Sequence, residues 1–193
     1  MGGVLDMDET ISLIEKAILY ATKAHLGQVR KSSGMPMIMH PIRVAEILRK
    51  AGFEEEVIAA GYLHDTVEDT PVTHEDLVCE FGESVAAIVA GNTENKALSW
   101  EERKEHTMQS IQTAAMPVKA LIVADKLDNL ESLMEEYLAK GEEVWSAFKR
   151  GREQQAWYFR GVAAHCLDGL QSEEIPSFFY TYQQKVAEFF KET

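Results

Sequence analysis

The sequence has few cysteines and no long hydrophobic run. Its two cysteines, Cys79 and Cys166, do not form a CxxC pair, and unpaired cysteines are typical of proteins in the reducing cytosol. No apolar stretch approaches the ~20 residues that a membrane-spanning helix needs. The N-terminal stretch MGGVLDMDET lacks the basic region and apolar segment of a secretory signal. We therefore expect a cytoplasmic protein with free thiols and no membrane attachment.

Positive charge is also scarce. Nineteen Lys and Arg residues stand against 32 Asp and Glu residues, which gives a net charge of −13. This balance argues against a protein that binds long nucleic acid, because such binding needs a basic surface that contacts phosphates. It is compatible with a small anionic substrate, since a local basic pocket or a bound metal ion can reverse the field inside a cleft.

Strand-like alternation bounded by hairpin turns is absent, whereas apolar residues recur at helical spacing. Two helix starts are predicted by residue pairs with the spacing of a capping box, namely Thr73 with Asp76 and Ser99 with Glu102. The other predicted helices cover about residues 8–26, 41–52, 54–66, 117–138, 142–170 and the segment after Pro176. The sequence therefore predicts an all-α helical bundle.

We expect residues 1–193 to form a single domain, since this length suits one domain with a sizeable core. The motifs that carry chemistry lie within about residues 11–133, and further helices follow at about 142–191. Late aromatic residues such as Trp145 and Phe179 are expected in the core or in the contacts of a homo-oligomer.

Four ionisable residues occur next to apolar segments. His40 lies in MIMHPIRVAEIL, His64 and Asp65 lie in GYLHDTVEDT, and Asp125 follows Leu-Ile-Val-Ala. A carboxylate that enters a core is costly unless it is paired or bound to a metal. Two imidazoles and two carboxylates form a mixed nitrogen and oxygen set that suits Mn²⁺, Fe²⁺, Co²⁺ or Zn²⁺. The sequence therefore predicts a metal site.

Each candidate ligand also has a structural interpretation. Taken alone, His40 is better explained as a core histidine that is hydrogen-bonded to a carbonyl. The His-Asp dipeptide taken alone is as compatible with an exposed helix end as with a metal site. Asp125 could form a salt bridge with Lys126 or Arg43. Beyond the dipeptide, Glu68 and Asp69 follow at helical spacing, which can direct several of these side chains into one cleft.

Basic residues gather in two places. Arg30 and Lys31 lie in the polar stretch Gly27–Met39, and a loop of that length in a helical domain is more often functional than idle. Taken alone, the two are best interpreted as a solvated pair. Lys96, Arg103 and Lys104 are interpreted as ordinary surface charges on an exposed helix.

The order of these motifs resembles the HD phosphohydrolase superfamily. An upstream His-Pro, HDTVEDT and ADKLDNL occur in the order of that superfamily. More narrowly, the chain is similar to the (p)ppGpp hydrolase domain of the RelA/SpoT family and its small stand-alone relatives. The segment Ala24–Ala45 matches a loop of that family, and AAGYLHDTVEDT matches its central motif. The resemblance covers about residues 11–133.

The resemblance implies a function and a set of site residues. The implied reaction is metal-dependent removal of the 3′-pyrophosphate of guanosine tetra- or pentaphosphate, with Glu68 and Asp69 positioning or activating the hydrolytic water. The implied ligands of one Mn²⁺ ion are His40, His64, Asp65 and Asp125. The implied contacts of the nucleotide are Arg30, Lys31, a serine of the pair Ser32 and Ser33, and Asn129.

Two residues depart from the family pattern. Met37 stands where the family has a tyrosine, and Glu131 stands where it has an arginine. A glutamate beside a phosphate-binding cleft would disfavour a highly charged nucleotide. A hydrolase of another nucleotide or phosphate ester therefore stays open as an alternative. A non-catalytic nucleotide sensor is a further alternative, although a sensor has no need of the acids Glu68 and Asp69.

Overall fold

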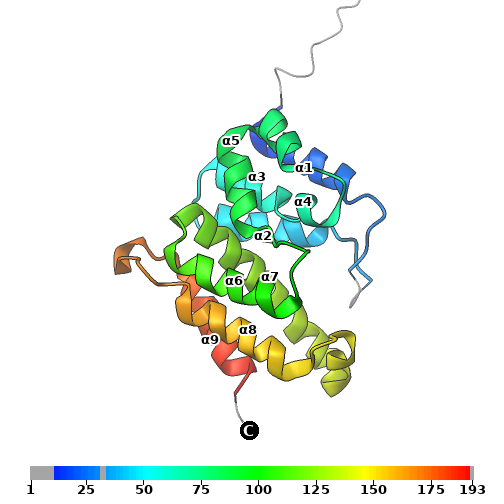
Figure 1. The fold of residues 1–193 in the computed structure, drawn as a ribbon, viewed down its shortest axis with the longest axis vertical. Coiled ribbons are helices and arrows are strands. Elements are labelled where there is room, and N and C mark those ends of the chain that lie inside the picture. Colours follow the sequence, from blue (N-terminus) through cyan, green and yellow to red (C-terminus); the bar gives the residue numbers. More distant parts are fainter. Residues whose placement is uncertain (1–10, 31–33, 192–193) are drawn as a thin grey trace, which may run out of the picture.

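The computed structural model describes residues 11–30 and 34–191, and in these ranges the fold is all-α (Figure 1). Their only β-type pairing is an isolated bridge between Val29 and Pro36. The predicted fold class is therefore confirmed. None of the described helices is both long and apolar enough to cross a bilayer.

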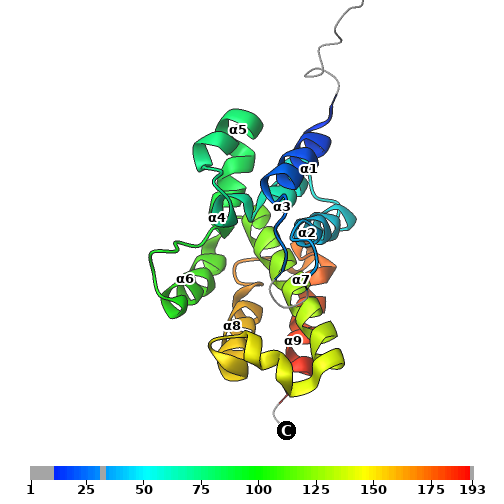
Figure 2. The ribbon, with the colours of Figure 1, turned by 90° about the vertical axis from the view of Figure 1, so that its right-hand side faces the viewer.

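The helices divide between two halves of the molecule, and α7 contacts helices of both (Figures 1 and 2). The N-terminal half holds α1 (Leu13–Ala24), α2 (Met39–Lys50), α3 (Glu55–Leu63), α4 (Thr66–Asp69) and α5 (His74–Asn92). The C-terminal half holds α6 (Trp100–Thr113), α7 (Met116–Lys140), the 3₁₀ helix η2 (Gly141–Ala147), α8 (Gly151–His165), the 3₁₀ helix η3 (Ser172–Glu174) and α9 (Ser177–Phe189).

Helices α3 and α7 are the buried axes of the fold. All residues from Val57 to Leu63 of α3 and from Lys119 to Asp125 of α7 are buried. A helix that is apolar on all sides must be surrounded by others, and α3 packs against α1, α2, α5 and α7. The polar residues at the ends of these apolar runs consequently meet inside the protein.

A glycine allows two of these helices to approach closely. A Cβ atom at Gly61 of α3 would lie 2.9 Å from the Cα atom of Ala45 in α2. A contact that short with backbone does not occur in proteins, so a larger residue would push the two helices apart. Gly61 thereby lets α2 bring His40 close to the end of α3.

Two predicted helices are interrupted. The helix expected over 54–66 ends at Leu63, and the short α4 starts at Thr66, so that His64 and Asp65 lie at the break. The single helix predicted over 142–170 is not formed, because the chain forms η2 and then starts α8 at Gly151. Gly151 has a φ angle of +68°, a left-handed conformation that glycine adopts readily and that no helix interior accepts. Both predicted capping boxes are present.

Candidate metal centre and cleft

The four predicted ligands converge from two helices, α2 and α7, and from the break between α3 and α4. The Nε2 atom of His40, in the first turn of α2, lies 3.1 Å from Nε2 of His64. The same His40 atom lies 3.2 Å from Oδ1 of Asp125 in α7 and 3.6 Å from Oδ2 of Asp65. Transition-metal ions bind such atoms at ~2.0–2.2 Å, so donor atoms that are 3–4 Å apart can share one ion.

The outer nitrogen of each imidazole ring is hydrogen-bonded. Nδ1 of His64 donates to the carbonyl of Gly61 at 2.8 Å, so its Nε2 carries the lone pair. Nδ1 of His40 pairs with Oδ2 of Asp128 at 2.6 Å, an arrangement typical of metal-binding histidines. Two lone-pair nitrogens face each other at 3.1 Å only if a cation, a proton or a metal ion, lies between them. The centre therefore fits a divalent ion.

The charges around His40 favour a cation at the same point. Burial disfavours a charge on His40, yet hydrogen bonds to Asp125 and Asp128 outweigh burial and raise the pKa of His40 to about 9. Burial also opposes the charge of Asp125, but Lys126 and the two histidines hold the pKa of this carboxyl well below its usual range. Three carboxylates around two rings thus create a negative centre in the core.

The alternative role of Asp125, a salt bridge with Lys126, is also present in the structure. Its Oδ2 accepts from Nζ of Lys126 at 2.6 Å, whereas its Oδ1, which faces His40, accepts from Nδ2 of Asn129 at 2.5 Å. Arg43 pairs with Asp128 and not with Asp125. Asp125 therefore forms a salt bridge through one oxygen and directs the other toward His40.

The two predicted acids differ in position. Glu68 lines the cavity beside the metal centre, and burial together with the charges of Glu94 and Asp65 raises the pKa of Glu68. Asp69 lies at the rim, where its side chain is 40% exposed and its Oδ1 is 2.6 Å from Nζ of Lys96. The structure brings Glu68, but not Asp69, to the centre.

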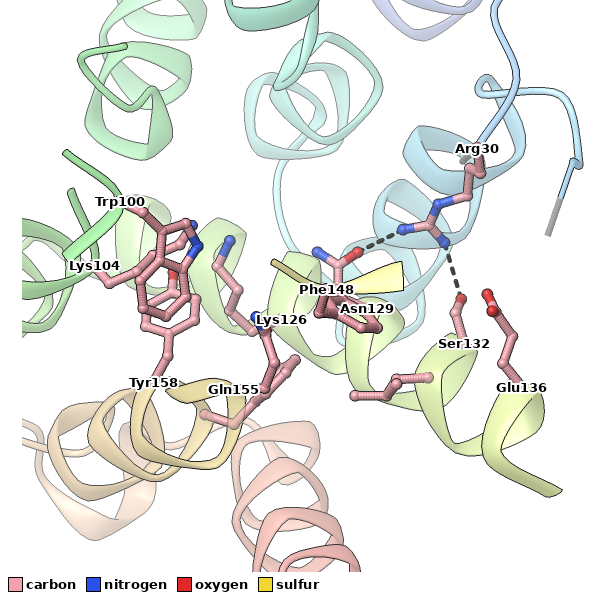
Figure 3. A pocket seen from close by; sticks show the side chains of 12 residues that line it. Arg30, Trp100, Lys104, Lys126, Asn129, Ser132, Glu136, Phe148, Gln155 and Tyr158 are labelled. Atoms are coloured by element: carbon pink, nitrogen blue, oxygen red, sulfur yellow. Dashed lines mark hydrogen bonds between the residues drawn. The ribbon is translucent and has the colours of Figure 1, made fainter. Parts of the chain in front are cut away.

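A cleft leads away from the metal centre. A cavity of about 260 Å³ touches His40, Asp65 and Asp125. A second cavity of about 270 Å³ extends between α7 and α8 (Figure 3). Because several residues line both, the two spaces adjoin. The shared residues are Arg30, Trp100, Lys104, Lys126 and Asn129.

The predicted nucleotide contacts are partly described. Arg30 donates to Oδ1 of Asn129 at 2.5 Å and to the hydroxyl of Ser132 at 2.9 Å, and both Arg30 and Asn129 line the cleft (Figure 3). Lys31, Ser32 and Ser33 lie outside the described residues.

The two departures from the family pattern have different positions. Met37 lines the cavity at the metal centre. Glu131 lines neither cavity, and its carboxylate lies 3.2 Å from Nζ of Lys185 on α9. The expected effect of Glu131 on substrate charge therefore loses its basis.

Two basic residues, Arg103 and Lys104, were interpreted as surface charges but line the cavity at the metal centre. The side chain of Lys104 is only 14% exposed; it lies 2.5 Å from Glu94 and 4.6 Å from the ring centre of Tyr158. Burial lowers the pKa of Lys104. Lys104 is therefore a cation of the cleft wall, and the interpretation as an ordinary surface charge is wrong for both residues.

Sequence reasoning also missed the acid behind His40. Asp128 is buried, pairs with His40 and Arg43, and lies 3.5 Å from Arg30. These partners hold the pKa of Asp128 below its usual range although burial opposes the charge. Its signal was present, because Asp128 follows Asp125 by three residues and therefore lies on the same helical face.

Comparison with known protein families and sequences gives consistent matches. The HD domain family matches residues 17–153. A guanosine-3′,5′-bis(diphosphate) 3′-pyrophosphohydrolase of Danio rerio is 40% identical over 132 residues, which cover 67% of this chain and 73% of that protein. A GTP pyrophosphokinase of Myxococcus xanthus is 38% identical over 135 residues. The match covers 65% of this chain but only 18% of the Myxococcus protein.

Solved structures show the same fold. The crystal structure of lmo0812 from Listeria monocytogenes EGD-e superposes with a TM-score of 0.77 at 52% identity, covering 79% of this chain and 99% of the other. A structure described as a metazoan ortholog of SpoT that hydrolyses ppGpp superposes with a TM-score of 0.78 at 26% identity. That match covers 93% of this chain and 96% of the other.

Proposed function

We propose that this chain, which belongs to the HD domain family, is a metal-dependent hydrolase that removes the 3′-pyrophosphate of guanosine tetra- or pentaphosphate. The observation that carries the proposal is the convergence of His40, His64, Asp65 and Asp125 at one end of a cleft that contains cations. The named activity of the Danio rerio relative, most of whose length is matched, supports this substrate. The synthetic activity of the longer Myxococcus protein is not carried over.

We propose Mn²⁺ as the ion, because two imidazoles and two carboxylates suit it. A divalent ion in such a site lowers the pKa of water and offsets the charge on phosphoryl oxygens. His40 and His64 would hold it through Nε2, with Asp65 and Asp125 supplying oxygens. Asp128 and the Gly61 carbonyl keep the two rings oriented.

We propose that Glu68 transfers protons in the reaction. In the proposed reaction, a water oxygen bonds to the phosphorus that is linked to the ribose 3′ oxygen, and that phosphorus–oxygen bond breaks. Glu68 accepts a proton from the water, and a proton passes to the 3′ oxygen, which leaves GDP or GTP and pyrophosphate. A carboxyl whose pKa is raised transfers protons near neutral pH more effectively than an ordinary glutamate. Asp69 would support this step from the rim.

The cleft gathers cations that phosphate groups can contact. Lys104 and Lys126 are nearly buried in its wall, and Arg30 lies across it. These cations attract phosphates in a space where screening by water is weak. Asn129 would contact the sugar, and we retain Lys31 and Ser32 or Ser33 as nucleotide contacts on the strength of the resemblance.

The direct test is pyrophosphate release from ppGpp by Mn²⁺-loaded protein, measured beside a panel of other nucleotides. We expect release from ppGpp, loss of release and of bound metal in Asp65→Ala, and unchanged helicity by circular dichroism. Asp168→Ala, which removes an exposed carboxylate far from the centre in sequence, is the matched control. A metal-free Asp65→Ala protein with full activity would contradict the proposed site.

A hydrolase of another nucleotide is the second candidate. Its support is Met37, a methionine in the wall of the cavity where the family pattern has a tyrosine. Release from a panel nucleotide but not from ppGpp would favour it, and tight binding without release from any nucleotide would indicate a sensor.

We further propose that the chain acts as one domain in the cytoplasm. Residues of both halves line the cleft, among them Arg30 and Tyr158. Cys79 and Cys166 are unpaired, as expected in a reducing compartment.

A further inference from the structure

The end of the cleft farthest from the metal centre holds a carboxylate. Glu136 lines the cavity between α7 and α8 together with Arg30, Ser132 and Phe148, and its side chain is only 13% exposed (Figure 3). Glu136 follows Ser132 by one helical turn, so both side chains share a face of α7. Its ion partner Lys140, at 3.3 Å, has a side chain that is 45% exposed. An exposed partner holds a carboxylate weakly, so a ligand in the cavity can compete for Glu136.

The charges along the cleft orient a nucleotide within it. Lys126 and Glu136 are ten positions apart on α7, roughly 15 Å at 1.5 Å per residue. Lys126 and Lys104 line both cavities and attract phosphates, whereas Glu136 lines only the second cavity and repels them. The uncharged part of the nucleotide, its base, therefore belongs beside Glu136.

Resting on the proposed function, we propose that Glu136 selects guanine by accepting hydrogen bonds from the N1–H and the amino group of the base. A carboxylate accepts only, and its two oxygens match the two adjacent donors on this edge of guanine. Adenine presents an unprotonated N1 on the same edge, which a carboxylate repels. Phe148 offers an apolar surface and Arg30 a planar guanidinium for the faces of the ring.

The test compares substrates that differ only in the base. Pyrophosphate release would be measured from ppGpp and from its inosine and adenosine counterparts, with wild type, Glu136→Gln and Glu135→Gln. Glu135 is the matched control, since it is the neighbouring glutamate on α7 and is exposed. We expect wild type to prefer guanine over hypoxanthine, which lacks the amino group, and hypoxanthine over adenine.

In Glu136→Gln, kcat/KM for ppGpp should fall about 10–100-fold, as expected for the loss of hydrogen bonds to a charged group. The adenosine substrate should not lose activity, and Glu135→Gln should behave as wild type. An equal loss for all three bases, or an unchanged guanine-to-adenine ratio, would overturn the proposal, because Glu136 would then be a structural residue.

A binding measurement separates this proposal from the proposed function. GDP and ADP would be titrated calorimetrically into Mn²⁺-loaded wild type and Glu136→Gln. If wild type releases pyrophosphate from none of the three substrates, the proposed function fails. Tighter binding of GDP than of ADP, with the difference lost in Glu136→Gln, would still support guanine selection. Equal affinities, or no binding of either nucleotide, would overturn it.

Discussion

Asp128 shows how much a single residue behind the metal ligands can contribute. It is not one of the four predicted ligands, yet it holds Nδ1 of His40 and joins that ring to Arg43. Residues that orient metal-binding histidines commonly change metal affinity 10–100-fold when they are replaced. The candidate site therefore extends beyond its four proposed ligands.

We expect Asp128→Asn to weaken Mn²⁺ binding by about 10-fold or more, because the substitution removes the negative charge that fixes the orientation of the His40 ring through Nδ1. Dissociation constants from metal titration test this. Asp168→Asn is the matched control, since Asp168 forms the same kind of pair with His165 on the surface, at 2.8 Å. Equal affinities in wild type and Asp128→Asn would mean that His40 is oriented by its packing alone.

Glu68 should make the metal-free fold less stable while serving the reaction. Its pKa is raised in the folded state, so the folded protein binds the proton more tightly than the unfolded chain does. The loss of folding stability that ionised Glu68 causes is absent below the pKa of this group in the unfolded chain, which is about 4.3 for an ordinary glutamate. It grows as pH rises and is complete above the folded pKa.

We therefore expect Glu68→Gln to raise the melting temperature of chelator-treated protein at pH 7.5 and to leave it unchanged near pH 4. With Mn²⁺, the same variant should lose about 10²–10⁴-fold in turnover and keep its metal. Melting curves at both pH values and metal analysis test the two parts. A gain in stability that is equal at pH 4 and pH 7.5 would show that ionisation of Glu68 is not its cause.

At the scale of elements, the site depends on a close crossing and on a break. Helix α2 approaches α3 at Gly61, and α3 ends at Leu63, so that His64 and Asp65 turn toward α7. The carbonyl of Gly61 also accepts the hydrogen bond from His64. One glycine thus sets both the distance between two helices and the orientation of a ligand.

Gly61→Ala should destabilise the protein by about 1–3 kcal/mol, the usual range for overpacking a core. The added Cβ would meet the backbone of Ala45, which cannot move alone. Gly161→Ala is the comparison, because its Cβ would meet the side chain of Met108, which is flexible and can rotate away. Urea denaturation measures the free energy of unfolding of each variant and so tests which one loses more stability. A larger loss in Gly161→Ala than in Gly61→Ala would contradict the interpretation of the α2–α3 crossing.

At the scale of the whole molecule, the metal ion should link the two halves of the protein. Its proposed ligands come from α2, the α3–α4 break and α7, and α7 contacts helices of both halves. An ion that binds the folded state alone stabilises it by mass action. The negative charge of the centre makes that binding favourable in a protein of net charge −13, as it relieves repulsion among carboxylates.

Removing the metal with a chelator should lower the melting temperature. At a free Mn²⁺ concentration of 100 times the dissociation constant, the ion contributes about 2.7 kcal/mol, which corresponds to about 5–10 °C for a protein of this size. Calorimetric scans with and without chelator measure the shift. Asp65→Ala should show no shift under the same conditions, and a shift as large as that of wild type would place the stabilising ion elsewhere.

Much of this protein was readable from local patterns. Helical spacing, the capping boxes at Thr73 and Ser99, and the polar residues that end the apolar runs before His64 and Asp125 are features of short segments. Short-range hydrogen bonding and the cost of burying a charge act within such segments, so they predicted the all-α class and the four candidate ligands. That these four groups share one site was implied by the family resemblance, since each of them alone could have found another partner.

Side-chain direction was not readable in this way. Asp69 faces Lys96 at the rim and Glu131 faces Lys185, whereas Lys104 enters the cleft and Glu136 lines its far end. Each of these positions depends on how helices that are distant in sequence cross, and on breaks such as the one at His64. Long-range packing sets those angles, because rotating a helix by half a turn about its axis exchanges its buried and exposed faces without changing any local sequence pattern.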